Sequence, residues 1–152
     1  MQFREVNYLR NPETEPAGLP RRNTEYDLLI VEDNVDLQDY YQILFTMTPW
    51  NVIGLVTDGL TAIKYYEDLF RKPAIVILDI DLPGCSGFDV AQQILTENPS
   101  QKIVFVSGMI DEYSIPDDLA HLPFISKPFR TDNLLQVLDS LRGSLKQFYP
   151  AQ

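Results

Sequence analysis

Short apolar runs that alternate with longer amphipathic stretches constrain the fold of this chain more than any other feature. The run "AIVILDI" at residues 74–80 is typical, because its apolar residues follow one another without a polar residue between them until Asp79. A strand of this kind is buried on both faces, as in a parallel sheet that helices cover on both sides. Because helical patterns separate the runs, consecutive strands are expected to be joined by crossover helices and to lie parallel. The sequence therefore predicts an α/β domain.

Five strands and five helices fit the alternation. Strands are expected at residues 26–33, 51–56, 74–80, 102–108 and 123–126. Helices are expected at residues 35–47, 60–70, 88–98, 111–121 and 132–149. Asn34 and Thr131 are the expected N-caps of the first and the last helix. Five such units predict a flavodoxin-like, doubly wound domain: a five-stranded parallel sheet in the order 2-1-3-4-5 with helices on both faces. The fourth helix contains Pro116, so we expect it to be short, late or partly unwound.

The first 26 residues differ in composition from the rest. They contain three prolines, show little periodicity, and balance four acidic residues with four arginines. We predict an irregular N-terminal extension over residues 1–26 and a folded domain over residues 27–148. Because only three residues follow the last helical pattern, no C-terminal output domain is expected.

Charge and cysteine content narrow the function classes. The formal net charge is -10 and the pI is about 4.4, which argues against direct binding to nucleic acid or to an anionic membrane surface. No apolar stretch is long enough for membrane insertion. The only cysteine, Cys85, cannot form an intramolecular disulfide and fits a reducing, cytoplasmic location.

Acidic residues end two of the predicted strands. Glu32 and Asp33 end the first strand, Asp79 ends the third, and Asp81 follows in the next loop. The carboxyl ends of these strands meet at one edge of the predicted sheet. Two unit charges about 4 Å apart repel by roughly 4 kcal/mol at an effective dielectric constant of about 20, so the cluster needs a cation or protons. Oxygen ligands favour Mg2+, which binds one or two carboxylates and keeps waters that a phosphate can replace.

The same edge carries groups that suit phosphoryl transfer. Asp79 ends the central strand and is the expected nucleophile, while Asp81 is expected to offer its backbone carbonyl to the metal together with the carboxylates of Asp33 and Asp79. Lys127 follows the fifth strand and can meet a phosphoryl group as a point charge. The hydroxyl of Ser107, at the end of the fourth strand, can donate to a phosphoryl oxygen. An aspartyl-phosphate is the expected product.

Four segments at these positions resemble the receiver domain of two-component response regulators. "LLIVEDN" resembles the acidic pair of the family's first strand, and "LDIDLPGCSG" resembles its phosphoacceptor segment. "VFVSG" matches the strand-four Ser or Thr, and "SKPF" matches the family's Lys-Pro pair. All four occur in the family's order and spacing, so the chain is similar to a stand-alone receiver domain over about residues 27–148. The resemblance implies a cis peptide bond between Lys127 and Pro128.

The resemblance also implies a role in a phosphorelay. Asp79 would accept a phosphoryl group from a sensor histidine kinase or a phosphotransfer protein, and the signal would pass to a downstream protein partner or through a homodimer. Ser107 and Phe124 would be the switch residues, and Glu32 would contact Mg2+ through water. Such a protein is not an enzyme beyond slow self-dephosphorylation. Phe124 stands where a tyrosine would offer a hydroxyl to a partner.

Two other functions compete with this one. A haloacid-dehalogenase-like phosphatase also uses an Asp-x-Asp motif after an apolar strand, followed by a Ser or Thr, a Lys and an acidic pair. Here the acidic pair, Glu32 and Asp33, precedes the motif, and no such pair follows Lys127. A pseudo-receiver would keep the fold without phosphorylation and act as an interaction module, but the acceptor, metal acid, hydroxyl and lysine are all in place.

Overall fold

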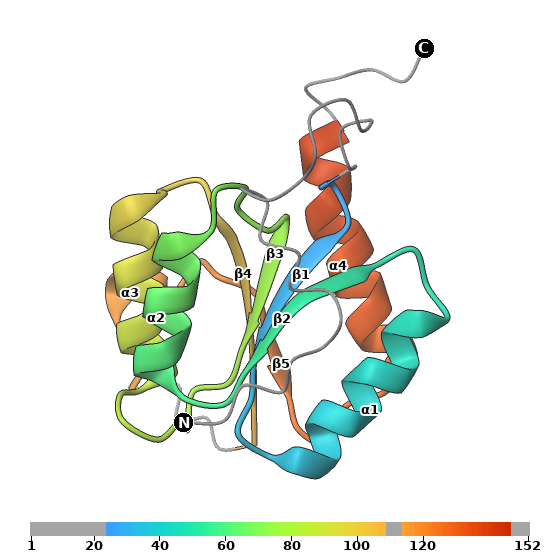
Figure 1. Ribbon diagram of the computed structural model, residues 1–152, viewed down its shortest axis with the longest axis horizontal. Helices are drawn as coiled ribbons and strands as arrows, with labels where there is room; N and C mark the ends of the chain where they lie inside the picture. The colour runs from blue at the N-terminus through green and yellow to red at the C-terminus, as the bar shows by residue number, and fades with distance from the viewer. Residues whose placement is uncertain (1–23, 109–113, 147–152) are drawn as a thin grey trace.

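A five-stranded parallel sheet forms the centre of the molecule, with the strand order β2-β1-β3-β4-β5 (Figure 1). The computed structural model describes residues 24–108 and 114–146. The strands are β1 (Asp27–Val31), β2 (Asn51–Val56), β3 (Ile75–Leu78), β4 (Lys102–Ser107) and β5 (Phe124–Ser126). Their order, their parallel pairing and their positions confirm the predicted doubly wound architecture.

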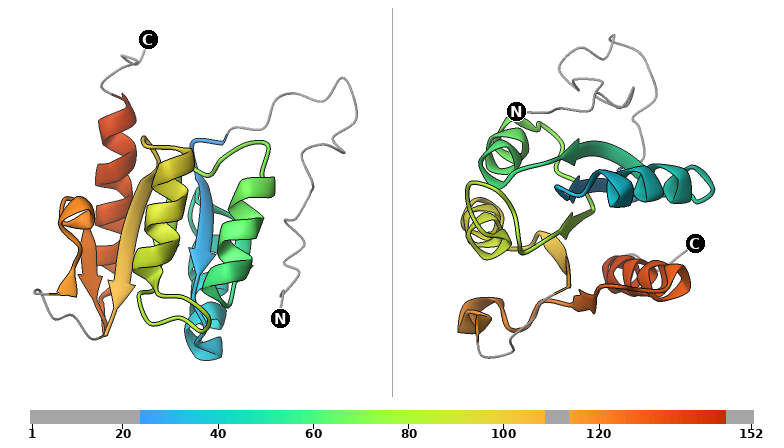
Figure 2. Two further views of the ribbon diagram at one scale, coloured as in Figure 1. Left: turned by 90° about the vertical axis from the view of Figure 1, so that its left-hand side faces the viewer. Right: turned by 90° about the horizontal axis from the view of Figure 1, so that it is seen from below.

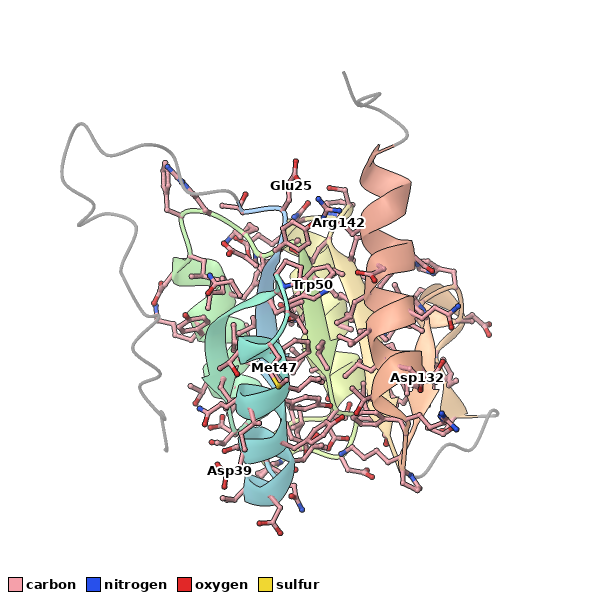
Figure 3. The ribbon with its side chains drawn as sticks, turned by 90° about the vertical axis from the view of Figure 1, so that its right-hand side faces the viewer. Glu25, Asp39, Met47, Trp50, Asp132 and Arg142 are labelled. Atoms are coloured by element: carbon pink, nitrogen blue, oxygen red, sulfur yellow. The ribbon has the colours of Figure 1, made fainter. Side chains whose placement is uncertain are left out.

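Helices cover both faces of the sheet. They are α1 (Val35–Thr46), α2 (Gly59–Asp68), α3 (Gly87–Glu97), α4 (Thr131–Lys146) and the 3-10 helix η3 (Asp117–Leu119). Seen from below, α2 and α3 lie on one side of the sheet, and α1 and α4 lie on the other (Figure 2). Side chains fill the space between α1, α4 and the sheet (Figure 3). No helix in the described part of the chain is long and apolar enough to cross a membrane.

Alternate residues of each strand enter two separate cores. In β1, Leu28 and Ile30 pack with α1 and α4, whereas Leu29 and Val31 pack with α2 and α3. Every residue of β1 is buried. Because side chains alternate across a strand, both faces must be apolar when both are covered, which explains the unbroken apolar runs of the sequence.

Polar caps fix where two of the helices begin. The side chain of Asn34 accepts a hydrogen bond from the backbone of Leu37 at 2.9 Å, as predicted. Ser86 and Asp89 form a reciprocal capping box at the start of α3. The prediction that Thr131 caps the last helix is wrong, because Thr131 is already the first residue of α4 and its hydroxyl bonds to Tyr40 instead.

The segment between β4 and β5 differs most from a regular β-α unit. Of the predicted helix at 111–121, residues 111–113 lie outside the described residues, and the remainder contains the 3-10 turn η3. Pro116 immediately precedes this turn. Within residues 114–121, this 3-10 turn agrees with the expectation that helix four is short, late or partly unwound. The predicted extension lies outside the described residues up to residue 23, as does the predicted last helix beyond residue 146.

Candidate functional site

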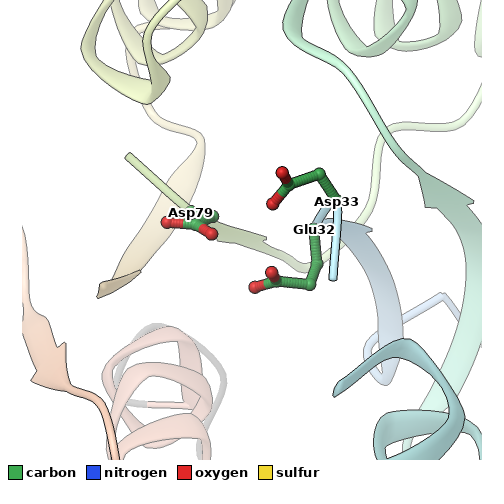
Figure 4. A group of neighbouring side chains, drawn as sticks. All are labelled: Glu32, Asp33 and Asp79. Carbon is green, nitrogen blue, oxygen red and sulfur yellow. The ribbon is translucent and has the colours of Figure 1, made fainter. Parts of the chain in front are cut away.

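Carboxylates from two neighbouring strands meet at the carboxyl edge of the sheet (Figure 4). Glu32 and Asp33 directly follow β1, and Asp79 directly follows β3. The strands pair Val31 with Leu78, and the backbone N–H of Asp79 donates to the carbonyl of Val31 at 3.0 Å. One carboxylate oxygen from each acid lies within 4.8 Å of the others. The predicted convergence of these three acids is therefore present in the structure, and their hard oxygen atoms suit a divalent cation.

Lys127 joins the cluster from the loop after β5. Its ammonium lies 2.9 Å from Glu32 Oε2 and 2.9 Å from Asp79 Oδ2. Its backbone N–H donates to the carbonyl of Ser107 at 2.9 Å, which fixes the base of the side chain beside β4. The sequence placed Lys127 at this edge, and the structure shows that it bridges two of the acids.

Burial makes the charges of the cluster costly. Glu32 is 1% exposed and Asp79 is 4% exposed, whereas Asp33 is open to solvent. Burial, with a smaller contribution from the charge of Asp79, raises the pKa of Glu32 to about 7, although contacts with Lys127 act in the opposite direction. Burial alone would lower the pKa of Lys127, but its hydrogen bonds and charge interactions with Glu32 and Asp79 outweigh this effect and raise it.

The loop after β3 holds Asp79 in place. The backbone N–H of Asp81 donates to Asp79 Oδ1 at 3.1 Å. Gly87 donates its N–H to the carbonyl of Ile80 at 2.8 Å, and a side chain at this position would collide with the backbone of Asp79. The side chain of Asp81 is exposed and does not belong to the group of converging carboxylates. The predicted role of its backbone carbonyl stays a prediction.

The two predicted switch residues lie on the neighbouring strands β4 and β5. Ser107 is completely buried, and its hydroxyl has no hydrogen-bond partner among the described residues. Phe124 is half-buried, and its ring lies 6.4 Å from that of Phe105. The peptide bond between Lys127 and Pro128 is cis, as the resemblance implied.

Two buried residues of α1 near the site were missed from the sequence. The side chain of Gln38 donates to the carbonyl of Glu32 at 2.5 Å, so it fixes the acidic loop to the helix. Tyr41 is fully buried, and its hydroxyl has no partner within residues 24–108 and 114–146. After burial, the charges of Glu32 and Asp79 contribute most to raising its pKa. The sequence pattern that could have identified them is their spacing with Phe45, which places all three residues on the buried face of α1.

Known proteins resemble this chain in sequence and in fold. The response regulator receiver domain family matches residues 28–139. The chemotaxis protein CheY of Listeria monocytogenes is 32% identical over 114 residues, which are 74% of this chain and 94% of that protein. In the crystal structure of the CheX-CheY-BeF3-Mg+2 complex from Borrelia burgdorferi, one chain matches with a TM-score of 0.70 and 27% identity, over 76% of this chain and 88% of the other. A CheY-like receiver domain from Methanospirillum hungatei has a TM-score of 0.72 at 20% identity, covers 80% of this chain and 96% of the other, and supports the fold.

The chain belongs to the response regulator receiver family. It is a phosphoacceptor switch of two-component signalling, and nothing in these similarities favours the phosphatase alternative.

Proposed function

We propose that Asp79 is the phosphoacceptor and that Mg2+ is held beside it. The observation that carries this proposal is the place of Asp79 in the cluster: it ends the central strand, touches Lys127, and shares the edge with the carboxylates of Glu32 and Asp33. In our assignment Asp33 and Asp79 bind the metal directly, Asp81 offers its backbone carbonyl, and Glu32 acts through water. The family similarity supports an acidic magnesium site of this kind.

The chemistry follows from the charges at this edge. A carboxylate oxygen of Asp79 attacks the phosphorus of the donor, the bond from phosphorus to the leaving group breaks, and the leaving group departs with the electron pair. Bound Mg2+ would neutralise negative charge on the phosphoryl oxygens. The Lys127 ammonium, which contacts Asp79 in the structure, supplies a second positive charge there.

Ser107 and Phe124 supply the response in this proposal. A buried hydroxyl without a partner costs free energy, and the Ser107 hydroxyl lies at the end of β4, next to β3. A phosphoryl group on Asp79 adds about -1.5 to -2 charge and offers acceptor oxygens for that hydroxyl. Phe124 is half-buried on the adjacent β5 and can follow the movement of Ser107.

The proposed partners are proteins. A sensor histidine kinase or a phosphotransfer protein delivers the phosphoryl group, and a downstream protein, or a second copy of the chain, reads the modified face. A related CheY has been crystallised with CheX, which supports protein binding as the output. We propose a cytoplasmic location and no catalytic turnover beyond self-dephosphorylation. Steady hydrolysis of a phosphomonoester would instead favour the phosphatase alternative.

Intact-mass measurement tests the acceptor directly. With phosphoramidate and Mg2+, the wild-type protein should gain the mass of one phosphoryl group, which chelation of Mg2+ should prevent. Asp79→Asn should gain none. Asp81→Asn is the matched control, because it changes a neighbouring acid but keeps the backbone groups that face Asp79, and it should still be modified. An unmodified wild type, or a modified Asp79→Asn variant, would contradict the assignment.

A further inference from the structure

The segment that follows Lys127 is held between two tyrosines of α1. The ring of Phe129 stacks on that of Tyr41, with centroids 6.2 Å apart and planes at 12°. Tyr40 meets the same ring edge-on, at 6.1 Å and 61°. Aromatic pairs at these separations add specific attraction beyond the area that they bury. Phe129 is therefore fixed from two sides by a single helix.

The far end of the same segment is also tied to α1. The hydroxyl of Tyr40 forms a hydrogen bond with the hydroxyl of Thr131, the first residue of α4. At the near end, the backbone of Lys127 bonds to Ser107 on β4. Residues 127–131 are thus held at both ends and in the middle, so the backbone that carries Lys127 has little freedom to move.

The acid that Lys127 contacts is fastened to the same helix. Gln38 of α1 donates to the carbonyl of Glu32, and the N–H of the cap residue Asn34 donates to Glu32 Oε1 at 3.2 Å. Helix α1 therefore positions both members of the ion pair: Glu32 through its own first turns, and Lys127 through Tyr40 and Tyr41. Neither tyrosine needs to touch a phosphoryl group to have this effect.

We propose that Tyr40 and Tyr41 are positioning residues for Lys127, acting through Phe129 and Thr131, and that this contact sets how well Lys127 meets the phosphoryl group on Asp79. The proposal rests on the proposed function, in which Lys127 stabilises the transfer. A displacement of about 1 Å in a reacting group can cost about 10²-fold in rate, so a modest relaxation of this segment has a measurable effect.

The test compares phosphorylation rates in two backgrounds, with phosphoramidate and saturating Mg2+. Phe129→Leu should slow the reaction about tenfold when Lys127 is present, and should have little further effect in a Lys127→Ala background, because residues that act through one group are not additive. Phe45→Leu is the matched control. Its ring also stacks on Tyr41, at 6.1 Å, but it lies on α1 itself. It should lower the melting temperature while leaving the rate within about twofold of wild type, because the substitution opens space in the core but keeps the rings of Tyr40, Tyr41 and Phe129.

A milder variant keeps the test decisive if Phe129→Leu does not fold. Tyr40→Phe keeps the ring against Phe129 and removes only the hydroxyl that meets Thr131. When Lys127 is present, this variant should slow phosphorylation about threefold, because losing one hydrogen bond misplaces Lys127 only slightly. When Lys127 is absent, the variant should not slow the reaction. Equal slowing in both backgrounds, or no slowing by either variant, overturns the positioning role. A wild-type protein that is not phosphorylated overturns the proposed function itself, so the two failures are distinguishable.

Discussion

Both ends of the sheet bury polar side chains, but the two ends differ in the charges and hydrogen-bond partners of these side chains. At the amino end, before β4, the amide of Gln101 accepts from the hydroxyl of Tyr66 at 2.7 Å and donates to the carbonyls of Pro73 and Lys102, each at 3.0 Å. All of these groups are neutral or backbone groups. A buried network of this kind, with both amide groups of Gln101 in use, rigidifies the fold.

At the carboxyl end, two buried acids face one lysine, and the hydroxyl of Ser107 has no partner in the part of the chain that the structure describes. Such an arrangement is unfavourable until a cation and acceptor oxygens arrive. The fold is therefore stabilised at the end away from the site, while the functional end keeps polar groups that a ligand can satisfy.

Removing the amide at the amino end should cost the most stability. Gln101→Leu removes the acceptor of the Tyr66 hydroxyl, which retains its contact with the Asn98 amide, and removes the side-chain donor of two backbone carbonyls. It should lower the free energy of unfolding by about 3 kcal/mol, as expected when several buried groups lose a partner. Gln93→Leu changes an exposed glutamine of α3 and should stay within about 0.5 kcal/mol of wild type. Urea unfolding measures both variants. If Gln101→Leu lowers the free energy of unfolding by less than about 1 kcal/mol, the amino end of the sheet does not stabilise the fold in the way described.

Mg2+ should stabilise the carboxyl end. At a free concentration of 100 times its dissociation constant, it should raise the free energy of unfolding by about 2.7 kcal/mol, because it binds the folded chain. Asp33→Asn should remove most of this gain, whereas Asp139→Asn, at an exposed acid of α4, should keep it. Melting curves with and without Mg2+ make the comparison. An equal gain in both variants would place the ion elsewhere.

Neutralising Glu32 should stabilise the protein when no Mg2+ is added. Glu32→Gln removes a buried charge, and Lys127 keeps Asp79 as its partner, so the free energy of unfolding at pH 8 should rise by about 1 kcal/mol. Glu97→Gln, at a partly exposed glutamate paired with Lys72, should change it by less than about 0.5 kcal/mol. A net loss of stability in Glu32→Gln would show that the ion pair outweighs its desolvation.

The pH dependence of the free energy of unfolding also tests the cost of burying the charge of Glu32. The folded chain raises the pKa of Glu32 from 4.5 to about 7, so between these values the unfolded chain loses the proton while the folded chain keeps it. The stability associated with Glu32 is therefore fully present below pH 4.5 and is lost as pH rises to about 7. The raised pKa of Lys127 acts only at alkaline pH. The advantage of Glu32→Gln in urea unfolding should grow from pH 5 to pH 8, and a constant advantage would contradict the assignment.

Two buried tyrosine hydroxyls give the smallest and most closely matched comparison. Tyr66→Phe removes a hydroxyl that donates to Gln101 and should cost about 1 kcal/mol. Tyr41→Phe removes a hydroxyl that has no partner among the residues the structure covers, and should leave the free energy of unfolding unchanged or raise it by up to about 1 kcal/mol. Thermal unfolding separates the two. A loss in Tyr41→Phe as large as in Tyr66→Phe would mean that the Tyr41 hydroxyl is satisfied in solution.

The sequence was sufficient for the fold and for the meeting of Glu32, Asp33 and Asp79, because strand ends in a doubly wound sheet share one edge. It was not sufficient for Gln38 or Gln101. Glutamine is common on exposed helices and loops, so only its place beside buried backbone carbonyls shows its role. Thr131 suited a helix cap by residue type, but its contact with Tyr40 depends on how α1 and α4 pack, which local patterns do not reveal.

The central claim is that Asp79, among the acids at this edge, takes the phosphoryl group. Reduction of the phosphorylated protein with borohydride converts an aspartyl-phosphate into homoserine, and peptide mass spectrometry then locates it. Homoserine is expected at position 79 alone, formed only when both donor and Mg2+ were present. Homoserine at Asp33 or Asp81, or none at all, would contradict it.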